Sequence, residues 1–361
     1  MSDKPANNVQ EKDVASNESQ RHCASMGNAT QLQRGRNMAL VYMRSFSIIC
    51  IVLHHAMCVF GKWPPNSPWA EQELPSWGWK MCSLTKDLGL SSFTFIAGFC
   101  AVQSLKKRTR ISFAMRKIEH LLIPCGFFGL LYWWMFPSMM LANSPVNGSH
   151  LWYIPMILLC FAALVVTTSR IVPKIFLLGI IWGFLAIGNN YLTNHPTCFD
   201  FSNQSFRPLK EFVSYFPVFV FGFLWASLDE WWPRGRLWSS MVFCIIVSWV
   251  ALEFPRSILW HCTFQLKLIC WGGMIFALFS LLAARWNPPA MLLSLDRCSF
   301  GIYVAHQYLL NAALLLLGQF VFHWVLELSA VFCVAFVGGW LLTCGWNQLG
   351  QISRAKELQV S

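Results

Sequence analysis

The sequence predicts an all-α integral membrane protein, a bundle of about ten transmembrane helices with both termini in the cytoplasm. Of its 361 residues, 56% are hydrophobic and only 12% are charged, whereas an ordinary soluble domain has about 25% charged residues. The apolar residues also fall in long blocks, such as residues 121–141. Such blocks approach the roughly 20 residues that a helix needs to cross about 30 Å of hydrocarbon.

Ten apolar segments are long enough to form the helices of this bundle. In chain order, we expect helices at residues 39–61, 87–105, 119–141, 151–168, 174–191, 212–228, 237–252, 265–284, 298–317 and 324–346. An even number of crossings brings both termini to one side. The tail and loops of that side hold 20 of the 27 Lys and Arg residues, and the opposite loops hold 7. Because cytoplasmic loops are rich in Lys and Arg, this is the cytoplasmic side.

The chain divides into three predicted parts. Residues 1–38 form a disordered polar tail, because a segment rich in Asn, Gln, Ser and Lys buries too little apolar surface to offset the entropy of ordering. Residues 39–348 form the transmembrane domain, and residues 349–361 form a short cytoplasmic tail. The net charge of +11 is spread between the apolar blocks, so we expect contact with membrane lipid and no nucleic-acid partner.

The fourteen cysteines lie mostly in apolar segments. We find no CxxC pair and no neighbouring His at metal-ligand spacing, so we interpret them as small buried hydrophobic residues and predict no metal site. Cys82, Cys198 and Cys262 fall in predicted outer loops, where a disulfide among them stays an open alternative.

The first predicted helix carries ionisable side chains at unusual depth. Arg44 lies near its cytoplasmic mouth, and His54 and His55 lie far inside. Eleven positions make about three helical turns, so Arg44 and His55 share a face about 16 Å apart, whereas His54 points elsewhere. Ionisable groups at this depth are costly and usually functional, and a neutral imidazole is suited to accept a hydroxyl proton. The alternatives are a topology anchor for Arg44 and an interhelical hydrogen bond for His55.

A basic cluster lies between the second and third predicted helices. Six Lys and Arg residues fall within residues 106–117, including Arg116 and Lys117, and His120 follows closely. Anchoring at the cytoplasmic surface explains one or two of them well. Six favour, in addition, a site for a phosphate-rich ligand that arrives from the cytoplasm.

Two other stretches carry polar aromatic side chains. Tyr303 and His306 are three positions apart, which places them on one face of a predicted helix that points into the protein. Trp152 and Tyr153 open the fourth helix from the outer side, where an interfacial aromatic belt is the alternative to a site.

Taken in order, these segments resemble the acyltransferase-3 family of multi-pass membrane O-acyltransferases. The counterparts of the family's motifs are an Arg and a His separated by ten residues (Arg44, His55), a Phe-rich motif (Phe93–Phe99), a basic motif that ends in Pro (Lys117–Pro124), a Leu-Trp-aromatic motif (Leu151–Tyr153) and Ser-aromatic-Gly-Ile-Tyr-x-x-His (Ser299–His306). Ala97 stands where the family has Ser, and Lys117 and His120 stand where it has two arginines.

The resemblance implies transfer of an acyl group, often acetyl, from cytoplasmic acyl-CoA to a hydroxyl. The acceptor is expected to be a carbohydrate, a lipid-linked sugar or another cell-envelope molecule, and the location a bacterial cytoplasmic membrane. His55 is then expected to be the general base, and Arg44 to orient the donor. A covalent acyl-enzyme on His55 stays open beside direct transfer.

The same resemblance assigns the other site residues to ligands. Those expected to hold the CoA phosphates are Arg116, Lys117 and His120. Those expected to line the substrate cavity are Trp152, Tyr153, Tyr303 and His306. The rival interpretation is a transporter or flippase for an envelope sugar or lipid, because intramembrane His and Arg also serve transport pathways. It predicts inverted repeats and broken helices, which we do not find in the sequence. A non-catalytic scaffold or sensor would explain neither the Arg/His pair nor the basic loop.

Overall fold

The computed structural model describes residues 37–61, 69, 74–135, 150–166, 207–228, 260–320 and 323–360, and all regular structure in them is helical. Residues 39–361 form one compact unit. The predicted helices at 174–191 and 237–252, and the predicted disordered tail up to residue 36, lie outside the described residues. The number of ten helices and the side of the termini therefore stay predictions.

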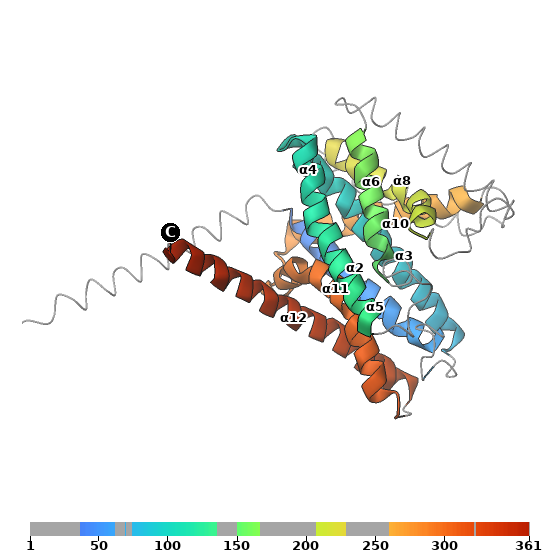
Figure 1. Cartoon of the computed structure of the whole chain (residues 1–361). Coiled ribbons are helices and arrows are strands. Elements are labelled where there is room, and N and C mark those ends of the chain that lie inside the picture. The colour runs from blue at the N-terminus through green and yellow to red at the C-terminus, as the bar shows by residue number, and fades with distance from the viewer. Residues whose placement is uncertain are drawn as a thin grey trace, which may run out of the picture. The chain divides into compact units, whose positions relative to one another are not determined.

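The described helices follow the other eight predicted segments (Figure 1). In chain order they are α2 (Met38–Cys58) with the 3₁₀ turn η1 (Val59–Gly61), α3 (Ser76–Lys106), α4 (Arg110–Lys117), the π-helical turn η2 (Ile118–Leu122), α5 (Ile123–Met135), the 3₁₀ turn η4 (His150–Trp152), α6 (Tyr153–Val166), α8 (Arg207–Leu228), α10 (Trp260–Arg285), α11 (Ala290–Leu317) and α12 (Trp324–Val360). Within this part of the chain, seven helical segments are long and apolar enough to cross a membrane, and residues 150–166 form a shorter apolar helix.

Several helices extend beyond their apolar blocks. α3 begins eleven residues before the predicted start at residue 87, and α12 continues to Val360 through the predicted C-terminal tail. α4 begins after Thr109, whose side-chain oxygen accepts the backbone N–H of Ser112 and caps the helix. Hydropathy locates the part of a helix that matches hydrocarbon, whereas capping and packing decide where the helix ends.

Small residues let α3 and α8 pack backbone against backbone. A Cβ atom at Gly98 would collide with the carbonyl oxygen of Phe219, and a Cβ atom at Gly222 would collide with that of Phe95. Phe95 is fully buried and lies in an aromatic cluster with Phe276 of α10, at 5.2 Å between ring centroids. The glycine and one phenylalanine of the Phe-rich motif thus have a packing role.

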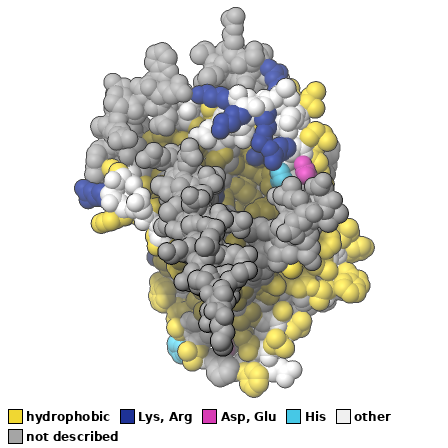
Figure 2. Space-filling model, turned by 90° about the vertical axis from the view of Figure 1, so that its left-hand side faces the viewer, with side chains coloured by type: hydrophobic (Ala, Val, Ile, Leu, Met, Phe, Trp, Pro, Cys, Tyr) yellow, Lys and Arg dark blue, Asp and Glu magenta, His cyan; other side chains and the backbone are white. Residues whose placement is uncertain are grey.

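Apolar side chains point outward and polar ones inward. On the peripheral helices α5 and α12, Trp134 and Trp346 are 76% and 77% exposed, whereas Gln307 and Asn311 of α11 are fully buried. Hydrophobic side chains cover much of the described surface in Figure 2, and Lys and Arg side chains gather towards its upper end. Because burial of polar groups and exposure of large apolar ones is unfavourable in water, this pattern fits a bundle surrounded by lipid.

Candidate active site

Arg44 and His55 lie at two levels of α2, and each contacts a polar residue of α11. Arg44 donates from Nη1 to Oδ1 of Asp296 at 2.9 Å and from Nη2 to Sγ of Cys100 at 3.2 Å. Nδ1 of His55 lies 3.1 Å from Nε2 of His306. The partners are ten positions apart on α11, against eleven on α2. α2 and α11 therefore run parallel, and Arg44 and His55 lie on the side of α2 that contacts α11.

Backbone carbonyl groups fix the protons of the His55–His306 pair. Nδ1 of His306 lies 2.7 Å from the carbonyl oxygen of Tyr303, which only accepts, so we assign the proton to this nitrogen and the lone pair to Nε2. That lone pair accepts Nδ1–H of His55, which also points to the carbonyl oxygen of Ile51 at 3.0 Å. In this tautomer Nε2 of His55 carries the lone pair, as a general base requires.

His150 joins His55 and His306 in a cluster of histidines, and it was not among the predicted site residues. Its ring centroid lies 4.7 Å from that of His306 and 6.1 Å from that of His55. Nε2 of His150 donates to the carbonyl oxygen of Tyr303 at 3.1 Å, and the Tyr303 hydroxyl donates to the carbonyl oxygen of His150 at 2.6 Å. The available signal was its position directly before the Leu151–Tyr153 motif.

A small cavity of about 20 Å³ lies beside His55. Lys86 of α3 and Arg207 of α8 line it together with His150. The guanidinium of Arg207 lies over the ring of Trp152, 4.7 Å from its centroid. Lys86 and Arg207 were not among the predicted site residues, because only the fold brings them to the histidines. Two cations and three imidazoles, those of His54, His55 and His150, thus surround a space with room for about one water molecule.

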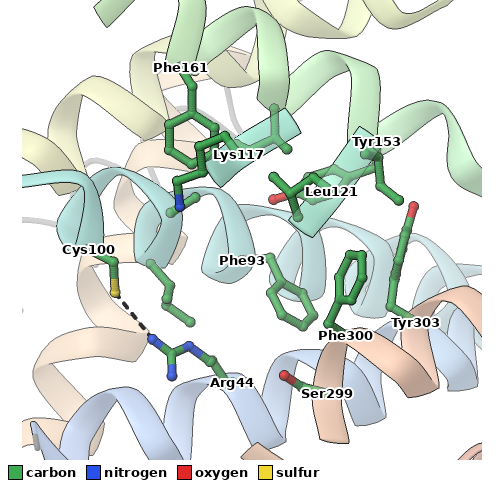
Figure 3. Close-up of a pocket in the computed structure, with 14 residues that line it drawn as sticks. Arg44, Phe93, Cys100, Lys117, Leu121, Tyr153, Phe161, Ser299, Phe300 and Tyr303 are labelled. Atoms are coloured by element: carbon green, nitrogen blue, oxygen red, sulfur yellow. Dashed lines mark hydrogen bonds between the residues drawn. The ribbon is translucent and has the colours of Figure 1, made fainter. Parts of the chain in front are cut away.

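A larger cavity of about 240 Å³ lies between α2, α3, α4, α6 and α11. Arg44 and Lys117 reach into it from opposite sides, and Phe93, Tyr153 and Tyr303 form part of its wall (Figure 3). Nζ of Lys117 lies 4.4 Å from the ring centroid of Phe161, a cation–π contact. The two tyrosines also line the small cavity, so they form the wall between the two spaces.

A third cavity of about 200 Å³ holds most of the basic motif. Arg108, Arg116, Lys117 and His120 line it, and Lys117 also lines the larger cavity. His120 lies in η2, where the backbone N–H of Ile123 donates to the carbonyl oxygen of Ile118. Pro124 explains this π turn, because a proline has no N–H to donate and its ring would collide with a carbonyl group of the preceding regular turn.

The predicted site residues line three cavities, except His306, which is fully buried and contacts His55 without lining any of these three. Arg116, Lys117 and His120 come together, as do His55 and His306, whereas Arg44 lines a different cavity from His55. Asp296, which forms an ion pair with Arg44, has a fully buried side chain. Asp296 was not among the predicted site residues, because in the sequence it stands beside Arg297 in α11 and its partner Arg44 lies 252 positions away.

This fold and this site define a polytopic membrane protein whose polar side chains converge on buried histidines. The profile of a family described as acyltransferase domain matches residues 38–344, most of the chain. The chain thus belongs to the acyltransferase-3 family and is an integral, multi-pass membrane acyltransferase. Membership favours acyl transfer over the transporter or flippase alternative. No curated protein and no solved structure matches the chain significantly.

Proposed function

We propose that this protein is a membrane O-acyltransferase that moves an acyl group, acetyl in the simplest case, from cytoplasmic acyl-CoA to a hydroxyl. The acceptor is a carbohydrate or lipid-linked sugar of the cell envelope, and the membrane is the bacterial cytoplasmic membrane. The observation that carries the proposal is the hydrogen bond between His55 and His306. It keeps the proton on Nδ1 of His55 and leaves the lone pair on Nε2. The small cavity beside His55, with its two cations, also supports it.

In the proposed reaction, Nε2 of His55 takes the proton of the acceptor hydroxyl. The hydroxyl oxygen then attacks the carbonyl carbon of the thioester. The C–S bond breaks, the acyl group stays on the acceptor oxygen, and the CoA thiolate leaves and takes the proton from Nε2 of the His55 imidazolium, which restores the neutral base. His306 accepts Nδ1–H of His55 throughout and so stabilises the imidazolium that forms. Lys86 and Arg207 supply positive charge for the oxyanion of the tetrahedral intermediate.

The donor binds from the basic end. Arg116, Lys117 and His120 hold the CoA phosphates through charge-assisted hydrogen bonds. The pantetheine arm extends past Lys117 into the larger cavity, where Arg44, held by Asp296, orients it. Its thioester then lies near the Tyr153 and Tyr303 wall. Trp152, the two tyrosines and His306 shape the space in which donor and acceptor meet.

The test is acyl transfer by purified protein in lipid vesicles, with radiolabelled acetyl-CoA and envelope glycans as acceptors. His55→Ala should lower turnover by about 10²- to 10⁴-fold, the usual contribution of a general base. His323→Ala is the matched control, because His323 is exposed and lies just before α12. Wild-type turnover in a normally inserted His55→Ala protein would refute the role of His55.

A further inference from the structure

His54, Cys58 and Cys82 form a second polar cluster, which the proposed reaction does not use. His54 and Cys58 are four positions apart on α2 and therefore share a face. Cys82 joins them from the second turn of α3. One ligand atom from each residue lies within 4.8 Å of the others, and all three side chains are at least partly buried. His54 and Cys58 are a His and a Cys at metal-ligand spacing, which the prediction of no such pair overlooked.

The distances between these atoms match a metal coordination sphere. Sγ of Cys58 lies 3.8 Å from Sγ of Cys82 and 3.5 Å from Nε2 of His54. Zinc bonds of about 2.3 Å to sulfur and about 2.0 Å to nitrogen, at tetrahedral angles, separate two sulfurs by about 3.8 Å and sulfur from nitrogen by about 3.5 Å. The Cys58–His54 pair therefore already has the required spacing, and the two sulfurs have it in the present orientation of the Cys82 thiol.

The hydrogen bond of His54 also suits a metal ligand. Its Nδ1 lies 2.9 Å from the carbonyl oxygen of Cys82, so Nδ1 carries the proton and Nε2 carries the lone pair. Metal-binding histidines almost always donate their second N–H to a carbonyl or carboxylate in this way. Sγ of Cys82 now lies 3.3 Å from Nδ1, so binding requires a rotation of this thiol towards the Nε2 side.

We propose that His54, Cys58 and Cys82 bind one zinc-type divalent cation through two thiolates and Nε2 of the imidazole. Both thiol protons leave on binding, so the charges of the cation and the two thiolates cancel. A neutral complex suits a partly buried position, where a net charge is costly. Thiolate and imidazole ligands select zinc over magnesium or calcium. Three protein ligands leave a fourth position for water or another small ligand.

The cation would link the end of α2 to the start of α3 next to His55, the proposed general base. The ring of His54 lies 5.0 Å from that of His55 between centroids. The bound metal therefore fixes the turn of α2 that carries His55, and His54 is a positioning residue. The metal proposal itself rests only on the three ligands and does not depend on acyl transfer.

Cobalt(II) is the probe for this site, because it replaces zinc and gives visible bands in tetrahedral thiolate coordination. We expect the full-length, reduced protein in detergent to retain one equivalent of cobalt after dialysis, with a sulfur-to-cobalt charge-transfer band that zinc abolishes. His54→Ala, Cys58→Ser and Cys82→Ser should each lose the band. The matched control is Cys344→Ser, which removes one thiol of the Cys298–Cys344 pair, whose sulfurs lie 3.4 Å apart.

Thermal unfolding gives a second measurement that needs no variant. Zinc that binds only the folded protein should raise the unfolding midpoint of the wild-type protein as its concentration rises. No retained metal in reduced wild-type protein, or a band that persists in Cys58→Ser, would overturn the proposal. The proposal would also be overturned if Cys58 and Cys82 formed a disulfide and the protein bound no metal after its reduction. Metal binding without acyl transfer would refute the proposed function and leave this site standing.

Discussion

His306 acts on the proposed chemistry through His55, since its Nε2 accepts the His55 proton and its Nδ1 is held by the Tyr303 carbonyl. His306→Leu should lower kcat about 10²-fold and leave the KM for acyl-CoA unchanged, because the base loses its orientation and the donor keeps its contacts. His306→Gln should recover part of the loss, since an amide oxygen can accept the same proton. Steady-state kinetics in vesicles checks both, and equal losses in the two variants would contradict this role.

The ion pair of Arg44 and Asp296 should stabilise the folded protein as well as hold Arg44 in position for the donor. The Asp296 side chain is fully buried and that of Arg44 is 27% exposed. Asp296→Ala should lower the free energy of unfolding by about 3 kcal/mol, because it removes the carboxylate from a largely buried guanidinium. Asp296→Asn, which keeps an oxygen acceptor, should cost less. Thermal unfolding in detergent measures both, and equal midpoints for Asp296→Ala and wild type would contradict the prediction.

Single residues also show how far the sequence could predict the site. Arg44 and His55 were recognised because ionisable groups are rare inside apolar blocks, and Arg116 and Lys117 because they cluster. Asp296 was not, because its significance depends on a partner 252 positions away. Helical periodicity tells which residues share a face of one helix. It does not tell which helix lies opposite that face, so contacts between helices required the structure.

At the scale of helices, Gly98 and Gly222 set the approach of α3 and α8. Gly98→Ala should lower the free energy of unfolding by about 3 kcal/mol, because the added methyl group meets a backbone carbonyl of Phe219 that cannot rotate away. Gly126→Ala on α5 is the matched control, since beyond its own helical turn no atom of the described residues lies within 4 Å of its new Cβ. It should be neutral or stabilising by about 0.5–1 kcal/mol. Thermal unfolding compares the two, and similar losses in both would contradict the packing role.

The basic residues of the α4–η2 segment are expected to bind the phosphates of the donor, which kinetics can test. Arg116→Gln and Lys117→Gln should each raise the KM for acetyl-CoA about 10-fold, since a charge-assisted hydrogen bond contributes about 1.5–3 kcal/mol. Arg116→Gln should not change the KM for S-acetyl pantetheine, which lacks the nucleotide phosphates, and Lys117→Gln should change it less than the KM for acetyl-CoA, because Lys117 also lines the larger cavity. Arg110→Gln is the control, because Arg110 begins the same helix outside the set of residues found to line the basic cavity. Equal effects on both donors would contradict phosphate binding.

Over the whole molecule, the three cavities run from the basic motif, through Lys117, to the Tyr153 and Tyr303 wall and then to His55. Hydropathy predicted the helices that carry these residues, because lipid constrains every crossing in the same way. It could not predict the cavities, because they arise where side chains of several helices fail to fill the space between them. The order of the cavities gives the bundle a direction, with the donor at the basic end.

That direction can be measured on α3, whose 31 residues span about 46 Å at 1.5 Å per residue, well beyond about 30 Å of hydrocarbon. Both ends therefore reach water. In a Cys198→Ser, Cys262→Ser, Cys333→Ser background, a membrane-impermeant maleimide should label Trp77→Cys in intact cells and Lys107→Cys only in inverted vesicles. The background protein without an added cysteine is the control. Labelling of Lys107→Cys in intact cells would place the basic motif outside, where cytoplasmic acyl-CoA cannot reach it, and would exclude the proposed path of the donor.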